Sequence, residues 1–254
     1  SSDLSLTVAI VPNTPLTWCA ESGDNVTFTA IPLAGNIPYI YTWTGADLDT
    51  TVGNNVTANP TIPGAYTYTV DVLDATGCHA GDTIHVTVYP SPSADAGIRD
   101  TVCFGTSVTL GGTPTAFGGT PGYTYTWDGG ASFVANPVIL ASTSFTYNVT
   151  VTDTHGCIDT SSVHLTVNNN PTANAGNDVT IPGCSPTGLS IGGSPVGTGG
   201  TPGYTYSWSP ATYLSSSTLA NPTVTGITAA ATYTVVVTDT NGCTGSDQVL
   251  VNVS

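Results

Sequence analysis

The sequence predicts an all-β protein that contains three copies of one repeated unit. Two observations carry this prediction: a composition suited to strands and turns, and landmark residues that recur at fixed spacings. Charged residues make up 7% of the 254 residues, while the apolar 39% is dominated by Val, Ile, Ala, Leu and Tyr, and Thr, Ser, Asn, Gly and Pro are abundant. β-branched and aromatic residues favour strands, and Gly and Pro favour turns, so a helix bundle is excluded.

The landmarks define the repeat. In each copy a Trp follows the first Cys by 24 residues, and a second Cys follows a Tyr by 10 residues. Such self-similarity is the signature of tandem units. We therefore expect domains at residues 1–90, 91–170 and 171–254, the first with an extended N-terminal strand. The landmarks are Cys19, Trp43, Tyr68 and Cys78 in copy one, Cys103, Trp127, Tyr147 and Cys157 in copy two, and Cys184, Trp208, Tyr233 and Cys243 in copy three.

The last third of each copy predicts a β-hairpin. Residues 66–72 and 233–238 alternate with the period of a half-buried strand. The strands meet at an Asp-x-x-Gly-Cys turn, whose glycine we expect at a positive φ. About seven short strands per copy around one buried Trp predict three tandem immunoglobulin-like β-sandwich domains, arranged as a rod. The turns span residues 74–78, 153–157 and 239–243, and the core tryptophans are Trp43, Trp127 and Trp208.

Several segments resemble a known group of domains. Residues 93–102 and 171–180 look like the opening strand of polycystic-kidney-disease-type domains. Gly-Gly-Thr-Pro-Gly-Tyr at 118–123 and 199–204, with the Val-Thr-Asp-x-x-Gly-Cys hairpin, resembles repeats of surface adhesins exported by gliding bacteria. Copy one departs from the pattern, because Ile37-Pro38-Tyr39 replaces the glycine-rich turn. The resemblance implies a sandwich used for length and display at the cell surface, and no catalysis.

The six cysteines lack metal-type spacing, so they predict disulfides and an oxidising, extracellular compartment. We expect each bond inside one copy, closing a loop of roughly 55 to 60 residues and contributing about 4 kcal/mol. A reactive thiol or metal ligand is the alternative, although no cluster of Lys, Arg or His accompanies the cysteines. The expected pairs are Cys19 with Cys78, Cys103 with Cys157, and Cys184 with Cys243.

Charge excludes several partners. Arg99 is the one basic Lys or Arg residue against sixteen acidic ones, and the net charge is −15. Such a chain offers no cationic surface to nucleic acid and is repelled by anionic membranes. It also lacks an apolar run near the roughly 20 residues of a membrane-spanning helix. We therefore expect neither nucleic-acid binding nor membrane insertion.

Motifs for catalysis or cofactor binding are missing as well. The sequence has no G-x-S-x-G elbow, P-loop or H-E-x-x-H, and Asp47 and Asp49 are interpreted as a turn pair. We expect no enzyme activity and no cofactor. Interdomain calcium is an alternative, because Asp95 and Asp100 flank the first linker, with Asp74 or Asp153 near a domain end, but no EF-hand loop is present. The histidines, expected on exposed faces, are His79, His85, His155 and His164.

The N-terminal segment has two interpretations. Residues 3–11 alternate, which places Leu4, Leu6, Val8 and Ile10 on one face. They form either a long first strand of domain one or a strand that pairs with the edge of the next molecule, giving polymerisation by strand addition. Possible glycosylation sites are Asn25, Asn55, Asn148 and Asn252, which begin N-x-S/T triplets, and Thr83 and Thr101, which resemble an O-glycosylation motif of the gliding-bacteria group.

Together these features predict a secreted structural protein, a segment or subunit of a cell-surface fibre, stalk or adhesin. It would self-associate into filaments or join neighbouring repeats of a longer chain. One rival hypothesis is a module that binds surface glycans or a protein; another is a spacer attached to a secreted enzyme. The module's candidate stacking residues are Tyr39, Tyr123, Tyr204 and Tyr213.

Overall fold

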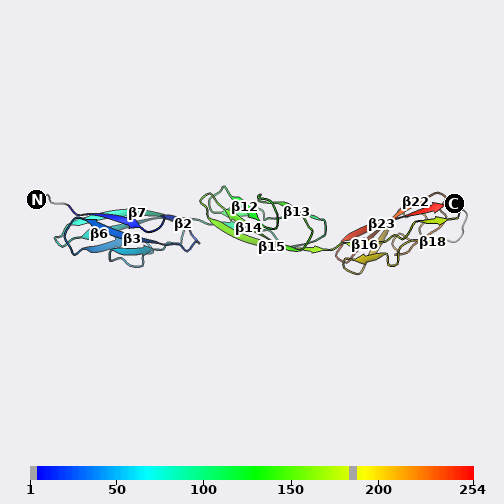
Figure 1. The fold of residues 1–254 in the computed structure, drawn as a ribbon, viewed down its shortest axis with the longest axis horizontal. Coiled ribbons are helices and arrows are strands. Elements are labelled where there is room, and N and C mark those ends of the chain that lie inside the picture. Colours follow the sequence, from blue (N-terminus) through cyan, green and yellow to red (C-terminus); the bar gives the residue numbers. More distant parts are fainter. Residues whose placement is uncertain (1–4, 183–187) are drawn as a thin grey trace. The chain divides into compact units, whose positions relative to one another are not determined.

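The computed structural model describes residues 5–182 and 188–254 (Figure 1). These residues form β-strands joined by turns. Within them, no helix has the length and apolar character needed to cross a membrane. The chain divides into two compact units, and the middle copy contributes to both of them. The first unit comprises Ser1–Gly97, Gly111–Pro137 and Asn148–Ser162; the second comprises Ile98–Leu110, Val138–Tyr147 and Val163–Ser254.

Each copy contains a four-stranded sheet of the same design. A long antiparallel hairpin forms its middle, a strand that ends in or near the Trp flanks one side, and a short opening strand flanks the other. The order is β2-β7-β6-β4 in copy one, β9-β15-β14-β12 in copy two and β17-β23-β22-β20 in copy three. In copy one the strands are β2 (Thr17–Cys19), β4 (Ile40–Thr44), β6 (Gly64–Leu73) and β7 (His79–Tyr89). In copies two and three they are β9 (Asp100–Cys103), β12 (Thr124–Trp127), β14 (Phe145–Thr152), β15 (Ile158–Asn168), β17 (Val179–Ile181), β20 (Thr205–Ser209), β22 (Ala231–Thr238) and β23 (Thr244–Val253).

Shorter antiparallel pairings accompany these sheets. Copy one has a three-stranded sheet of order β1-β3-β5, formed by β1 (Thr7–Pro12), β3 (Val26–Leu33) and β5 (Asn55–Ala58). Copies two and three each have two strand pairs instead. These are β8 (Pro92–Ala94) with β11 (Ala116–Gly118), β10 (Ser107–Thr109) with β13 (Val138–Leu140), β16 (Pro171–Ala173) with β19 (Gly197–Gly199), and β18 (Leu189–Ser190) with β21 (Thr223–Val224).

The three landmark tryptophans are buried. Trp43, Trp127 and Trp208 are 1%, 4% and 2% exposed. Each indole N–H donates to a backbone carbonyl, that of Gly53, Val134 and Leu219 respectively, so burial leaves no unpaired donor. In copy one Phe28 stacks on Trp43 with ring centroids 6.1 Å apart. In each copy, every second side chain of the strands thus points to the face that packs around the Trp.

The opening strand of each four-stranded sheet runs parallel to the last strand. Cys19 lies opposite Tyr89, the final residue of β7, and Cys103 lies opposite Asn168, the final residue of β15. We call the cysteine at this position the first-position cysteine, and the cysteine after the Asp-x-x-Gly turn the hairpin cysteine. In copies one and two the two kinds lie at opposite ends of the same sheet, because the hairpin cysteine precedes the last strand.

The N-terminal segment forms β1 of the three-stranded sheet of copy one. β1 pairs with β3 from Thr7 opposite Leu33 to Pro12 opposite Phe28. Leu6 is buried and Val8 and Ile10 pack against the core. This pairing agrees with the interpretation of the segment as a first strand of domain one, because β1 pairs with a strand of its own copy and not with the edge of another molecule. Leu4 lies outside the described residues.

Candidate functional site

Two disulfides join consecutive copies of the repeat. Cys19 of copy one is bonded to Cys157 of copy two, with Cα atoms 5.6 Å apart. Cys103 of copy two is bonded to Cys243 of copy three, with Cα atoms 5.5 Å apart. Both sulfurs of each bond lie within one compact unit. The rule is the same in both cases: a first-position cysteine bonds the hairpin cysteine of the following copy.

The expected pairs inside each copy are therefore wrong. Cys19 does not bond Cys78, Cys103 does not bond Cys157, and Cys243 is bonded to Cys103 and not to Cys184. The parallel opening strand explains the error. The 11 residues of β7 separate Cys78 from the strand end beside Cys19, and at about 3.3 Å per residue the two ends are about 30 Å apart. A disulfide needs Cα atoms closer than about 7 Å.

The hairpin cysteine follows a turn that is organised by a buried aspartate. In copy two, Asp153 Oδ1 accepts the backbone N–H of His155 and of Cys157, both at 2.9 Å, and Oδ2 accepts the N–H of Thr120. Asp239 accepts the matching bonds from Asn241, Cys243 and Thr201 in copy three. The carboxylate therefore fixes the backbone of the cysteine and ties the hairpin to the preceding loop.

Copy one builds the same turn without a bonded cysteine. Asp74 Oδ1 accepts the N–H of Thr76 and of Cys78, and Oδ2 accepts the N–H of Asn36. The Thr76 hydroxyl donates to the same carboxylate at 2.7 Å. The geometry that presents the hairpin cysteine is thus repeated in all three copies.

Hydrogen bonding lowers the pKa of all three carboxyls. For Asp74 the hydroxyl of Thr76 is the main cause, followed by the amide of Cys78. For Asp239 the amide of Thr201 lowers the pKa most. Burial raises the pKa of Asp153, but the amides of Thr120, Cys157 and His155 together outweigh burial and lower it. The carboxylates are therefore held in the charged, accepting form.

The turn also requires a glycine. Gly77, Gly156 and Gly242 have φ angles of 88°, 81° and 80°, as the sequence predicted. A Cβ on any of the three would meet nothing within 4 Å. Backbone conformation, not space, therefore selects glycine here.

The first-position cysteine is held at the end of the last strand. Beside Cys19, the N–H of Ala20 donates to the carbonyl of Tyr89 at 2.9 Å. Beside Cys103, the N–H of Phe104 donates to the carbonyl of Asn168 at 2.8 Å. At the junction between copies one and two, where Cys19 is bonded to Cys157, the ring of Tyr89 also stacks on that of His155, with centroids 3.7 Å apart. The junction is thus a packed contact as well as a covalent bond.

Burial separates bonded from unbonded hairpin cysteines. Cys157 and Cys243 are 0% and 1% exposed. Cys78 is a free, exposed cysteine. Cys184, the first-position cysteine of copy three, lies outside the described residues. Cys78 thus has no disulfide partner among the residues that the structure describes.

The histidines are spread over separate places. His79 pairs with Asp71 at 2.9 Å. His85 and His164 contact Thr67 and Thr146 within their hairpins, and His155 contacts Thr120. No cluster of three or more His, Cys, Asp or Glu side chains suited to a metal is found among the residues that the structure describes.

Most of the acidic residues considered for calcium or catalysis accept hydrogen bonds from backbone N–H groups. Asp95 accepts from Gly97, and Asp100 from Thr101. Asp49 accepts from Thr57 at 2.7 Å, and Asp47 has a φ of 56° in the same turn. Asp74 and Asp153 organise their hairpins. The structure therefore brings none of these carboxylates together as a set of cation ligands.

The candidate glycosylation sites lie in different surroundings. Asn25, Asn55, Thr83 and Thr101 are exposed, whereas Asn252 is partly buried within β23. The amide of Asn148 donates to Asp128. Among the four triplets, Asn25, Asn55 and Asn148 are thus exposed and Asn252 is partly buried.

Three of the four candidate stacking tyrosines close the loop before the Trp strand. The hydroxyls of Tyr39, Tyr123 and Tyr204 donate to the carbonyls of Ala34, Gly118 and Gly199. Their rings are partly buried, while Tyr213 is exposed. The repeated contact gives these three rings a structural role in the loop.

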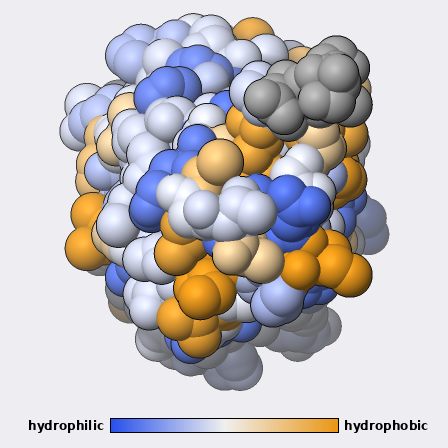
Figure 2. All heavy atoms as spheres, turned by 90° about the vertical axis from the view of Figure 1, so that its left-hand side faces the viewer, coloured by the Kyte–Doolittle hydropathy of each residue, from blue (hydrophilic) through white to orange (hydrophobic). Residues whose placement is uncertain are grey.

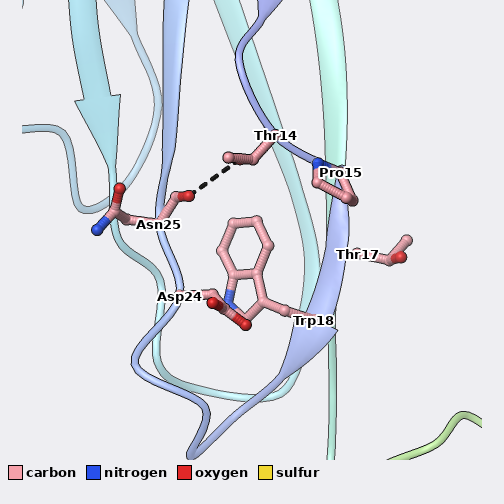
Figure 3. A pocket seen from close by; sticks show the side chains of 6 residues that line it. All are labelled: Thr14, Pro15, Thr17, Trp18, Asp24 and Asn25. Atoms are coloured by element: carbon pink, nitrogen blue, oxygen red, sulfur yellow. Dashed lines mark hydrogen bonds between the residues drawn. The ribbon is translucent and has the colours of Figure 1, made fainter.

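A small cavity in copy one lies beside Trp18, a tryptophan that is not one of the three repeat landmarks. Its volume is about 200 Å³, and Figure 3 shows the Trp18 indole between Asp24 and the hydrogen bond that joins Thr14 to Asn25. Trp18 is 7% exposed, so it forms a wall and offers no open ring face. Ligand pockets usually enclose about 300 to 1,000 Å³, so this cavity is a poor glycan site.

No family model and no curated protein matches the sequence. Among solved structures, the chain is similar to the three-domain I-band fragment I67-I69 of titin, at 16% identity over 98% of both chains with a TM-score of 0.51. It is also similar to a C-terminal fragment of intimin in complex with the intimin-binding domain of the translocated intimin receptor, at 18% identity over 68% of both chains with a TM-score of 0.46. The likeness to titin shows the fold. The chain is a protein of tandem immunoglobulin-like β-sandwich domains, as the sequence predicted.

Proposed function

We propose that this chain is a non-enzymatic structural protein outside the cell, a segment or subunit of a surface fibre, stalk or adhesin. The observation that carries the proposal is the covalent link between consecutive copies. Disulfides between repeats limit the movement of one repeat against the next and persist only in an oxidising compartment. A chain whose repeats are bonded to one another is suited to carrying tension or holding a binding surface at a distance.

The sequence features agree with this role. The resemblance of copies two and three to repeats of gliding-bacteria adhesins supports a place at the bacterial surface. A net charge of −15 with a single Arg keeps the chain away from anionic surfaces and leaves trypsin-like proteases one cleavage site. No group of described residues is arranged for catalysis.

Strand addition through residues 3–11 is a second route to assembly. It requires β1 to leave β3, which would expose the buried side chain of Leu6 and unpair the strand. Deletion of residues 1–11 tests this route by electron microscopy. Loss of filaments without loss of the folded sandwich would support strand addition, and unchanged filaments would contradict it.

Surface labelling tests the proposed function itself. Antibody against the chain should label intact, unpermeabilised cells of the source, and electron microscopy should show the label along fibres. An antibody against a cytoplasmic protein is the control for cell integrity. Label that appears only after permeabilisation would overturn the proposal.

A further inference from the structure

We propose that Cys78 is a covalent assembly site, and that its partner is the first-position cysteine of a second copy of this chain. The inference deepens the proposed fibre function and rests on it for its biological setting. It would join copies head to tail by the same link that joins the repeats within one copy.

The first support is the repetition of the bonding rule. Both other hairpin cysteines, Cys157 and Cys243, are bonded, and each is bonded to the first-position cysteine of the copy before it. Copy one presents its cysteine from the same turn, with the Asp74 carboxylate accepting the N–H of Cys78 at 2.9 Å. The partner that this rule requires is a cysteine of a preceding repeat.

The second support is the difference in exposure. Cys157 and Cys243 are buried, whereas Cys78 is exposed although its turn is the same. A cysteine left unpaired in a secreted protein indicates either a bond to another molecule or a reactive free thiol. The remaining cysteine in the sequence is Cys184, which has the first position in copy three and lies outside the described residues. Cys78 and Cys184 are thus the two cysteines of the sequence that take no part in the two described disulfides.

The surface around Cys78 is the third support. β2 pairs with the last residues of β7, so the β6–β7 turn lies at the other end of the sheet, the left-hand end of Figure 1. Figure 2 views that end and shows apolar patches between polar ones. Ile37 and Ile40, from the loop and strand beside the turn, are 79% and 62% exposed. Burial of these side chains would favour a protein partner over solvent.

The chemistry needs a mild oxidant, a small disulfide such as glutathione disulfide. The Cys78 thiolate attacks it and releases one glutathione thiol. The incoming cysteine thiolate then attacks the Cys78 sulfur of the mixed disulfide and releases the second glutathione. Two protein thiols are oxidised to one disulfide, and one glutathione disulfide is reduced to two thiols.

The test uses the 254-residue chain in a glutathione redox buffer, followed by alkylation and non-reducing electrophoresis. We expect a ladder of covalent multimers that dithiothreitol collapses to monomer. Cys78→Ser and Cys184→Ser should each abolish the ladder while keeping Cys19–Cys157 and Cys103–Cys243, because Cys78 takes no part in either bond. An equimolar mixture of the two variants should give dimers and nothing larger.

Three results would overturn the proposal. The wild-type chain could stay monomeric with alkylated Cys78; Cys78→Ser could form the same ladder; or either variant alone could dimerise as well as the mixture. Peptide mapping of the protein purified from its source is a further test. If Cys78 is bonded to a cysteine of its own polypeptide, the preceding repeat belongs to a longer chain. That result would exclude a second copy as the partner of Cys78. Failure of surface labelling, by contrast, would remove the proposed function and leave the ladder intact.

Discussion

Cys19 is bonded to Cys157, 138 residues further along the sequence, and not to Cys78 in its own copy. The bond crosses from the end of β2 to the start of β15, where the first copy meets the second. Its counterpart from Cys103 to Cys243 spans 140 residues. Disulfides in this chain therefore act between β-sandwiches, and each sandwich holds its own core by packing around a Trp.

Trypsin provides a direct test of this pairing. Arg99 is exposed and is the single tryptic site of the sequence. Cleavage there should leave the two fragments together on a non-reducing gel, because Cys19–Cys157 crosses the cut, and should release them on reduction. The Arg99→Gln variant should stay whole in both gels. Separation without reductant would mean that the bonds lie inside the copies.

The glycine of the hairpin turn should be sensitive to any side chain. Gly242→Ala should lower the free energy of unfolding by about 1 to 2 kcal/mol, because alanine is strained at a φ of 80°. Gly242→Asn should cost less, since Asn tolerates this conformation better. Urea unfolding monitored by tryptophan fluorescence measures both. Equal stability of Gly242→Ala and wild type would show that the turn relaxes at no cost.

The Asp153 carboxylate should stabilise the hairpin through its hydrogen bonds. Asp153→Asn replaces one oxygen by an N–H₂ group, so at least one amide among Thr120, His155 and Cys157 loses its acceptor. The expected cost is about 2 kcal/mol, measured by thermal or urea unfolding. Asp24→Asn, at an exposed position, is the matched control and should change stability little. A loss of similar size in both variants would contradict the role of Asp153.

Stability should fall in acid for the same reason. The folded pKa values of Asp74, Asp153 and Asp239 lie below their unfolded values. Their contribution is therefore fully present above a pH of about 4 and is lost as the pH falls through the lowered folded pKa values. Melting temperatures should be level from about pH 5 to 7 and should decrease below about pH 4.

A single variant shows which groups cause that decrease. Asp239→Asn removes one of the three titrations, so its melting temperature should depend less steeply on pH in the acid range than that of wild type. The carboxyl resonances of the three aspartates, followed by NMR, give the titrations directly. Aspartates that titrate at their ordinary pKa would contradict the proposed cause.

Periodicity and fixed spacing were sufficient to predict the fold. The alternation of Tyr, Thr and Val around Trp43 and Trp208 gave strands and a buried face, because strand side chains alternate between core and solvent. The positive φ of Gly156 followed from turn chemistry alone. Local rules sufficed for these features since each depends on residues that are close in sequence.

The disulfide pairing could not be obtained in the same way. Spacing shows which cysteines are equivalent, but not whether the strand of Cys103 runs parallel or antiparallel to β15. Parallel pairing places Cys103 beside Asn168, at the end next to the following copy, and that choice decides the partner. The carboxylate network of Asp153 was also missed, since its link to Thr120 joins segments 33 residues apart. The recurring Asp before each hairpin cysteine was the available signal.

The two bonds also change how the chain responds to pulling at its ends. Their loops overlap between residues 103 and 157. The shortest covalent path from one terminus to the other crosses from Cys19 to Cys157, runs back along the backbone to Cys103, and crosses again to Cys243. That path includes only roughly a third of the residues, so even complete unfolding under force would lengthen the oxidised chain to about a third of its reduced contour.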